Sequence, residues 1–344
     1  MGNLCVTAES DKASEGVQIN IAAPSGVSQI KSNDPDPVEK YSHITLTITG
    51  YDKIPDDNKF TMSDEFVKAI GSSKVLALFN SKGGFPFRLA DYKGKDNKYE
   101  FINQNGIVYY GQIKTTFEGQ KIKQGQGYLK EIDDHHTGKA FYAGYFDNDN
   151  FEGPGILIAN DRDCYRGIWH NNAMSGFGYF SNSQGLEYEG EWSNMTQEGH
   201  GIEKWNYNTT SYVYKGAFKN GKKCGKGLLK NLTADTVYEG DFFDNMAHGK
   251  GVYTWPDGKR YEGDLRNDSL HGKGVFDWKD GRRYVGGYVN DKKEGWGEFV
   301  WPDGKRYIGN WKDGKQHGTG TFFNEGKEIK GEWEAGKKLK SADK

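Results

Sequence analysis

The chain has 344 residues and a net charge of −2, and its 48 glycines make glycine about twice as frequent as in an average protein. Aromatic residues make up 14%, which excludes a disordered chain because disordered chains are poor in aromatic side chains. A net charge this small gives no general attraction to nucleic acid, and three widely separated cysteines form neither a disulfide framework nor a zinc-binding pattern.

The first seven residues resemble an acylation signal. Gly2 follows the initiator methionine, as N-myristoylation requires, and Cys5 is close enough to accept a palmitoyl chain. Val6 departs from the pattern, which favours Ser or Thr at that position. Because one myristoyl chain binds a membrane only marginally, we expect Cys5 to carry the second lipid anchor. The alternative is a soluble protein that begins with Met-Gly by coincidence.

Two segments are predicted before the repeats begin. Residues 1–40 combine the acylation signal with a stretch rich in Ser, Asp, Pro and Gly, which is typical of a mobile linker. Residues 41–108 contain strand-like alternation at 43–50, a helix-start pattern at 61–64 and an apolar run at 74–79. We predict that this second segment is a small α+β cap covering the open edge of the first hairpin, with a binding module as the alternative.

From residue 109 the sequence repeats a short phrase with a period near 23 residues. Each repeat opens with Tyr-x-Gly and continues with Gly-x-Gly, in most repeats 11 residues after the tyrosine. Turns of the Pro-Asp-Gly type separate several repeats, with glycine where a positive φ is expected. A partial tenth repeat occupies residues 329–333. The nine full repeats open at Tyr109, Tyr142, Tyr165, Tyr188, Tyr214, Tyr238, Tyr261, Tyr284 and Tyr307.

This spacing predicts a mainly β fold over residues 109–344. Tyrosine, glycine and the second aromatic residue are two positions apart and share one face of a strand, so each repeat forms a hairpin. Because one hairpin is barely stable alone, the hairpins should stack into an elongated single antiparallel sheet or solenoid. Rings should lie over glycines, so larger residues at Gly263 or Gly286 are expected to destabilise the fold. Asp268 lies in a loop where we expect spacing to matter more than the side chain.

The repeated phrase resembles the MORN repeat (membrane occupation and recognition nexus), over residues 109–336. Ile113 and Leu265 depart from it at the second aromatic position, and Glu294 stands where neighbouring repeats carry His. The resemblance implies a non-enzymatic scaffold or adaptor at the cytoplasmic face of a membrane, at the cell cortex or on the cytoskeleton. The alternatives are a structural component of a ciliary or axonemal assembly such as the radial spoke, and a regulatory subunit of a separate lipid kinase.

The sequence predicts no catalytic, cofactor-binding or metal site. The Gly-x-Gly pairs neither open a helix nor precede Gly-Lys-Ser/Thr, so they do not form a phosphate-binding loop. His248, His271 and His317 occupy equivalent places in different hairpins, too far apart to share one ion. Acidic residues recur with the repeat, whereas a catalytic pair needs one unique pocket that separates two pKa values.

Basic pairs before three successive tyrosines predict a ladder of positive charge. They could contact anionic phospholipid headgroups or an acidic protein, and the alternative is a solvated turn neutralised by nearby Asp and Glu. We expect protein partners, with anionic phospholipid and a second copy of the chain as further candidates, and no nucleic acid. The basic residues are Lys259, Arg260, Arg282, Arg283, Lys305 and Arg306.

Overall fold

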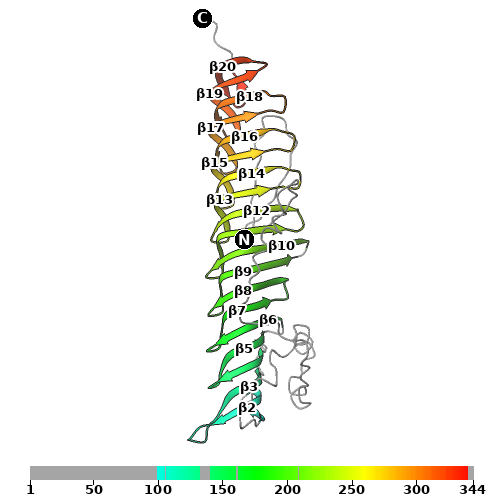
Figure 1. Cartoon of the computed structure of the whole chain (residues 1–344), viewed down its shortest axis with the longest axis vertical. Coiled ribbons are helices and arrows are strands. Elements are labelled where there is room, and N and C mark those ends of the chain that lie inside the picture. Colours follow the sequence, from blue (N-terminus) through cyan, green and yellow to red (C-terminus); the bar gives the residue numbers. More distant parts are fainter. Residues whose placement is uncertain (1–98, 105, 132–139, 160–161, 208, 340–344) are drawn as a thin grey trace. The chain divides into compact units, whose positions relative to one another are not determined.

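Every regular element that the computed structural model describes is a β-strand, which confirms the prediction of a mainly β fold. The 21 strands are hydrogen-bonded in one sheet, and the pairings within it are antiparallel (Figure 1). Gly2, Cys5 and most of the predicted cap over 41–108 lie outside the described residues. The described residues are 99–104, 106–131, 140–159, 162–207 and 209–339.

The described chain divides into two compact units between Glu203 and Lys204, within strand β9 (Thr196–Tyr207). The first unit contains, before β9, β1 (Tyr99–Gln104), β2 (Ile107–Thr115), β3 (Lys121–Glu131), β4 (Ala140–Asp147), β5 (Asn150–Ala159), β6 (Asp163–His170), β7 (Ala173–Ser181) and β8 (Leu186–Ser193).

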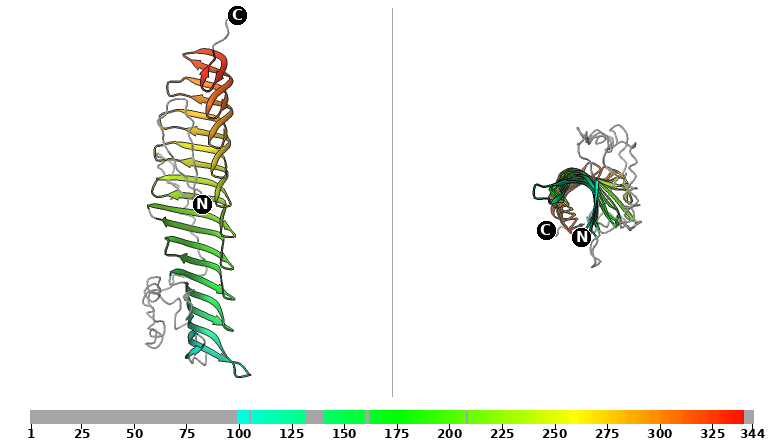
Figure 2. Two further views of the ribbon diagram at one scale, coloured as in Figure 1. Left: turned by 180° about the vertical axis from the view of Figure 1, so that it is seen from behind. Right: turned by 90° about the horizontal axis from the view of Figure 1, so that it is seen from below.

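The second unit follows the same hairpin plan after β9 (Figure 2). Its strands are β10 (Thr210–Lys219), β11 (Lys222–Asn231), β12 (Thr236–Phe243), β13 (Met246–Thr254), β14 (Arg260–Arg266), β15 (Ser269–Asp277), β16 (Arg283–Val289), β17 (Lys292–Val300), β18 (Arg306–Lys312), β19 (Lys315–Asn324), β20 (Lys327–Glu334) and β21 (Lys337–Lys338).

The two glycines of each Gly-x-Gly have different roles. In the repeat formed by β14 and β15, Gly274 pairs with Gly263 across the hairpin, and the register shifts immediately afterwards at a β-bulge. The first glycine, Gly272, has a φ of +63°, a conformation that residues with a Cβ rarely adopt. The first glycine has a positive φ in all nine repeats, so this position provides the bulge while the second glycine provides space.

The space over the paired glycines is filled by the tyrosine that opens the repeat. A Cβ added to Gly274 would lie 2.4 Å from the Tyr261 ring, and one added to Gly263 would lie 2.4 Å from its hydroxyl oxygen. That hydroxyl donates a hydrogen bond of 2.7 Å to the backbone carbonyl of Asp264, three residues later. Gly286 lies under Tyr284 in the same way. The predicted packing of rings over glycines is therefore confirmed.

The repeat that opens at Tyr165 is an exception to this arrangement. Eight of the nine opening tyrosines donate to the carbonyl three residues later, and Tyr165 instead packs its ring against Phe180 at 4.7 Å. The sulfur of Met174 occupies the space over the glycines, because a Cβ at Gly178 would lie 2.9 Å from it. A fully buried thioether can replace the ring because methionine adapts to irregular gaps.

In most repeats the second aromatic residue of the tyrosine strand contacts the preceding repeat. The ring of Tyr288 meets Tyr284 of its own repeat edge-on, with centroids 5.3 Å apart and planes at 88°. It meets Tyr261 of the preceding repeat in the same way, at 5.5 Å and 87°. Edge-to-face pairs of this kind stabilise by about 0.5–1.5 kcal/mol beyond the burial of their area. Each hairpin therefore buries part of its neighbour.

A second set of contacts joins the turns at the other end of the hairpins. Asn267 and Asp268 form a two-residue turn in which both φ values are positive, at 48° and 67°. The Asp268 carboxylate accepts a hydrogen bond of 2.7 Å from the N–H of Ala247, and its own N–H donates to the Ala247 carbonyl at 2.9 Å. The expectation that spacing matters more than the side chain at Asp268 is therefore wrong, because this side chain is hydrogen-bonded to the preceding turn.

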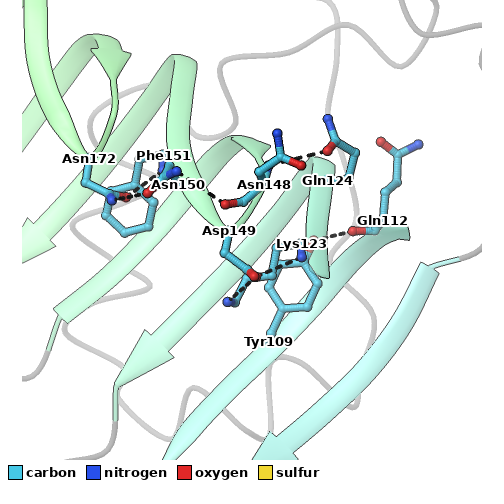
Figure 3. Close-up of polar contacts among 9 residues, drawn as sticks. All are labelled: Tyr109, Gln112, Lys123, Gln124, Asn148, Asp149, Asn150, Phe151 and Asn172. Atoms are coloured by element: carbon cyan, nitrogen blue, oxygen red, sulfur yellow. Dashed lines mark hydrogen bonds and ion pairs between the residues drawn. The ribbon is translucent and has the colours of Figure 1, made fainter. Parts of the chain in front are cut away.

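We call this contact, in which a turn side chain accepts a hydrogen bond from the backbone of the preceding turn, the clamp. It recurs in the first unit, where Figure 3 shows two examples. Asp149 accepts a hydrogen bond of 2.9 Å from the backbone N–H of Lys123. Asn172 accepts one of 2.7 Å from the N–H of Phe151, and its amide also donates to the side chain of Asn150 at 2.6 Å. Either an amide or a carboxylate oxygen therefore serves as the clamp.

Candidate interaction surface

Side chains along each strand alternate between two faces, which we call the tyrosine face and the opposite face. In the second unit the tyrosine face is a buried aromatic layer, and the opposite face carries charged residues such as Glu239 and Glu262 in line with Val252. A partner can reach much of the opposite face of this unit, because its side chains are exposed or half-buried except at Val237 and Thr254.

The predicted basic ladder lies along three successive repeats of the second unit, and the structure pairs every member with a carboxylate. Neutralised clusters attract anionic phospholipid weakly, and exposed ion pairs contribute about 0–1 kcal/mol each to stability. The pairs are Lys259–Asp257 (2.8 Å), Arg260–Glu262 (2.7 Å), Arg282–Asp280 (2.8 Å), Arg283–Asp277 (2.6 Å), Lys305–Asp303 (2.6 Å) and Arg306–Glu298 (3.3 Å).

Three of these pairs also build the turns between repeats. In one of them Asp303 accepts a hydrogen bond of 3.1 Å from the backbone N–H of Lys305 as well as the side-chain contact. The side-chain hydrogen bond from Lys305 lowers the pKa of the Asp303 carboxyl. Gly304 follows with a φ of +83°, as the Pro-Asp-Gly pattern predicts. The first basic residue of each pair thus has a local structural role in its turn.

A second series of charged residues, lysine–aspartate pairs at one position of successive repeats, lies on the opposite face and ends after two repeats. Lys226 pairs with Asp241, and Lys250 pairs with Asp264 one repeat later, both at 2.7 Å. The hydrogen bond from Lys250 lowers the pKa of the Asp264 carboxyl. In the next repeat the residue opposite the lysine is a glycine without a side chain. Two repeats therefore have a neutralised pair at this position, and the third has only a lysine.

The interrupted position adjoins an exposed tryptophan. Lys273 lies opposite Gly287 on the neighbouring strand, and Trp296 occupies the equivalent place one repeat later. The Trp296 side chain is 62% exposed, and Val285 on β16 is 42% exposed. Tryptophan is one of the residues that supply much of the binding energy at protein interfaces. This surface was not among the sequence predictions, although a tryptophan inside Gly-x-Gly, where other repeats of this unit carry lysine or threonine, is a visible signal.

The tyrosine face holds a second irregular residue, Lys293, which is only 7% exposed. Its ammonium lies over four aromatic rings, at 4.7–5.4 Å from their centroids. Cation–π contacts of this kind contribute about 2 kcal/mol when they are desolvated. Lys223, at the equivalent position three repeats earlier along the chain, lies 5.3 Å from the centroid of the Tyr214 ring. The four rings around Lys293 belong to Trp278, Tyr284, Phe299 and Trp311.

The histidines of the repeat lie apart from one another in the described part of the chain. His248 contacts Asn267 at 3.3 Å through Nδ1, and no described group of three His, Cys, Asp or Glu side chains is arranged to hold a metal ion. No helix within the described ranges is long and apolar enough to cross a membrane.

Eight stretches of the chain match the MORN repeat family, so this array consists of MORN repeats, as the resemblance predicted. The repeat at Tyr109 falls outside the matched stretches, yet Tyr109 covers Gly111 and Gly127 as the opening tyrosines other than Tyr165 do. The matched residues are 142–164, 165–186, 188–206, 214–230, 238–260, 261–282, 284–306 and 307–327.

Part of the chain is also similar to Alsin. Over 113 residues it is 31% identical to Alsin of Homo sapiens and of Pan troglodytes, and 30% identical to Alsin of Mus musculus. This stretch is 33% of the chain and spans 6% of the length of Alsin. The similarity therefore concerns a small part of those relatives.

Proposed function

We propose that this protein is a non-enzymatic scaffold that binds a protein partner through the opposite face of its second unit. The observation that carries the proposal is the exposed Trp296, at the position equivalent to Lys273 in the repeat after the ladder of lysine–aspartate pairs stops. An aromatic anchor one repeat from a cation without a facing carboxylate suits a partner that presents an apolar group and an acidic group.

The position of the scaffold in the cell is a second part of the proposal. Acyl chains on Gly2 and Cys5 would hold the protein at the cytoplasmic face of a membrane, as the N-terminal pattern suggests. The ion pairs of the basic ladder favour protein over phospholipid as the ligand of the array, because its positive charges are already balanced. A partner in the cytoskeleton, or in a ciliary assembly, would then be linked to that membrane.

Affinity capture from the native cell tests the binding face with a matched control. Trp296→Ser removes the exposed anchor, and Phe243→Ser removes a side chain that is equally exposed, at 64%, at the end of a hairpin. We expect the main co-purifying proteins to be lost with Trp296→Ser and retained with Phe243→Ser, while both variants keep the wild-type melting temperature. Equal recovery with the two variants would place the partner on another surface.

A further inference from the structure

The opposite face of the first unit differs in composition from that of the second. It carries apolar side chains on five successive strands, β2 to β6, in direct register: Ala143 pairs with Tyr128 on one side and Ile156 on the other, and Ile158 pairs with Cys164. We call this set the apolar patch. It consists of Val108, Tyr128, Phe141, Ala143, Ile156, Ile158 and Cys164.

The apolar patch is buried, with every member between 0% and 2% exposed. Side chains of one sheet shield each other laterally, but they leave their tips open unless another layer lies above them. Val285, in the corresponding row of the second unit, is 42% exposed although its register partner Val275 is also apolar. The patch is therefore covered by a layer that the row around Val275 and Val285 lacks.

The described residues supply no such layer. Among the described strands of the first unit, extensive contacts join each strand only to its neighbours within the sheet. A face of this size left open would be unusual, since monomeric soluble proteins rarely expose large contiguous apolar patches. The cover must come from chain outside the described residues or from another molecule.

The geometry points to residues 41–98 of the same chain, and we propose that this segment docks on the apolar patch. It ends at residue 98, immediately before β1, which pairs with β2 at the border of the patch. The five strands of the patch span roughly 19 Å at 4.7–4.9 Å per step, a distance that about six extended residues cross. The segment contains apolar residues to match, in the runs 43–50 and 74–79.

A covalently joined segment also has an advantage over any other occupant. Its effective concentration near the patch is in the millimolar range, so it competes well against a second copy of the chain. The docked segment covers a face of the sheet as a second layer, which differs from the edge-covering cap that the sequence predicts. The patch is then unavailable to outside partners, whereas the exposed side chains of Val285 and Trp296 in the second unit stay open to them.

The rate at which the Cys164 thiol reacts with a reagent in solution measures whether the patch is covered, because this residue is 0% exposed within the patch. In a background with Cys5→Ser and Cys224→Ser, N-ethylmaleimide should modify native Cys164 at least 100-fold more slowly than urea-denatured Cys164. Leu76→Asp with Leu78→Asp should accelerate the modification at least 10-fold. The matched control, Val17→Asp with Ile19→Asp, changes the linker and should leave the rate unchanged.

Three outcomes of this experiment would overturn the proposal. They are fast modification in the parent protein, an unchanged rate in the Leu76 and Leu78 variant, or protection that weakens on dilution, which would indicate a second copy. Hydrogen exchange of the amides in β10–β20 shows whether the array of each variant remains folded. If the variant unfolds throughout, the cross-linking measurement below decides.

Amine cross-linking of the unmodified protein gives that independent measurement. Lys130 lies on β3 between two members of the patch, in register with Val108 and with Phe141. In a mixture of 15N-labelled and unlabelled protein, we expect a short lysine cross-linker to join Lys130 to lysines of 41–98 within one chain. Links that form only between labelled and unlabelled chains, or only to residues 1–40, would overturn the proposal.

Discussion

The carboxylate of Asp268 accepts a hydrogen bond of 2.7 Å from the backbone N–H of Ala247, which lies one repeat earlier in the chain. Burial raises the pKa of this carboxyl to about 6, and the charge of Asp291, in the next turn, adds to the effect. The clamp therefore has an unfavourable component at neutral pH, because the charged form is poorly solvated. The equivalent Asn245 makes the same contact with Lys223, at 2.8 Å, without a charge.

We predict that Asp268→Asn stabilises the protein at pH 7 and that Asp268→Ala destabilises it. The asparagine keeps the acceptor and removes the buried charge, a gain of about 1 kcal/mol after allowance for partial exposure. The alanine leaves the Ala247 N–H without its acceptor, a loss of about 1–2 kcal/mol. Urea unfolding at pH 7 measures both changes. Asp280→Asn, at a solvated turn, is the control and should shift the free energy of unfolding by less than 0.5 kcal/mol.

The pH dependence has a definite sign. The folded carboxyl of Asp268 titrates near pH 6 and the unfolded one near pH 4, so the folded state holds more protons between these values. Stability from this group is therefore fully present below about pH 4 and is lost as the pH rises through 6. The gain from Asp268→Asn should be larger at pH 7 than at pH 4.5. An equal gain at both values would contradict a buried, charged clamp.

A second prediction concerns the ring over the glycines. Gly274→Ala should cost about 1–3 kcal/mol, because the three atoms nearest the new methyl group all belong to the Tyr261 ring, at 2.4–2.6 Å. In a Tyr261→Ala background that clash disappears, so Gly274→Ala should cost much less. The double-mutant cycle, measured by urea unfolding, should give a coupling above 1 kcal/mol.

Gly263 is the matched control for this cycle. A methyl group there also meets backbone, the Cα of Gly274 at 2.5 Å and the carbonyl of Lys273 at 2.6 Å. Gly263→Ala should therefore remain destabilising when Tyr261 is removed. If both glycine variants recovered equally in the Tyr261→Ala background, the distinction between ring contact and backbone contact would be wrong.

The fold was predictable because the spacing of residues within a repeat determines which side chains share a face of the strand. Alternation places tyrosine and glycine on one face of a strand, and the absence of a Cβ leaves room for the ring, as at Tyr261 and Gly274. The replacement of the ring at Tyr165 by Met174 was not predictable, because it depends on how one side chain fills a gap. The clamp at Asp268 was missed because its partner, Ala247, is 21 residues away and contributes only backbone.

The candidate surface was predictable only in part. The basic residues were visible as a pattern, but their ion pairs depend on which carboxylates the register places beside them, such as Asp277 beside Arg283. The exposed Trp296 interrupts the repeat, and a search for what recurs passes over such a residue. Under the proposed function, departures from the repeat mark the binding surface, and the repeat itself does not.

A third prediction uses two adjacent lysines on β17. Lys293 is 7% exposed and lies within the aromatic rings, whereas the neighbouring Lys292 points to solvent and pairs with Asp313 at 2.9 Å. Limited acetylation followed by peptide mass spectrometry should modify Lys292 at least 10-fold faster than Lys293. Trp311→Ala opens one side of the ring cluster and should narrow this ratio. Similar rates for the two lysines in the native protein would contradict the buried position of Lys293.

The last prediction separates lipid anchoring from attraction by the basic ladder. If acyl chains hold the protein on membranes, Gly2→Ala should release it to the soluble fraction of the native cell, because myristoylation needs the amine of that glycine. Cys5→Ser should leave weak, reversible binding, since a single acyl chain is marginal. Stability should not change in either variant, because neither residue belongs to a repeat.

If the basic ladder were the membrane anchor, binding would survive Gly2→Ala and be lost with Arg282→Ala and Arg283→Ala together. This double variant tests that alternative. Both arginines are already paired, with Asp280 and Asp277, so we expect this double variant to remain on membranes. For the same reason, purified protein without acyl chains should bind vesicles of anionic phospholipid weakly, even at low salt where attraction between charges is least screened. Membrane binding that survives Gly2→Ala and is lost with the arginine variant would make the ladder the anchor. Binding that survives both changes would require a partner protein to hold the array at the membrane.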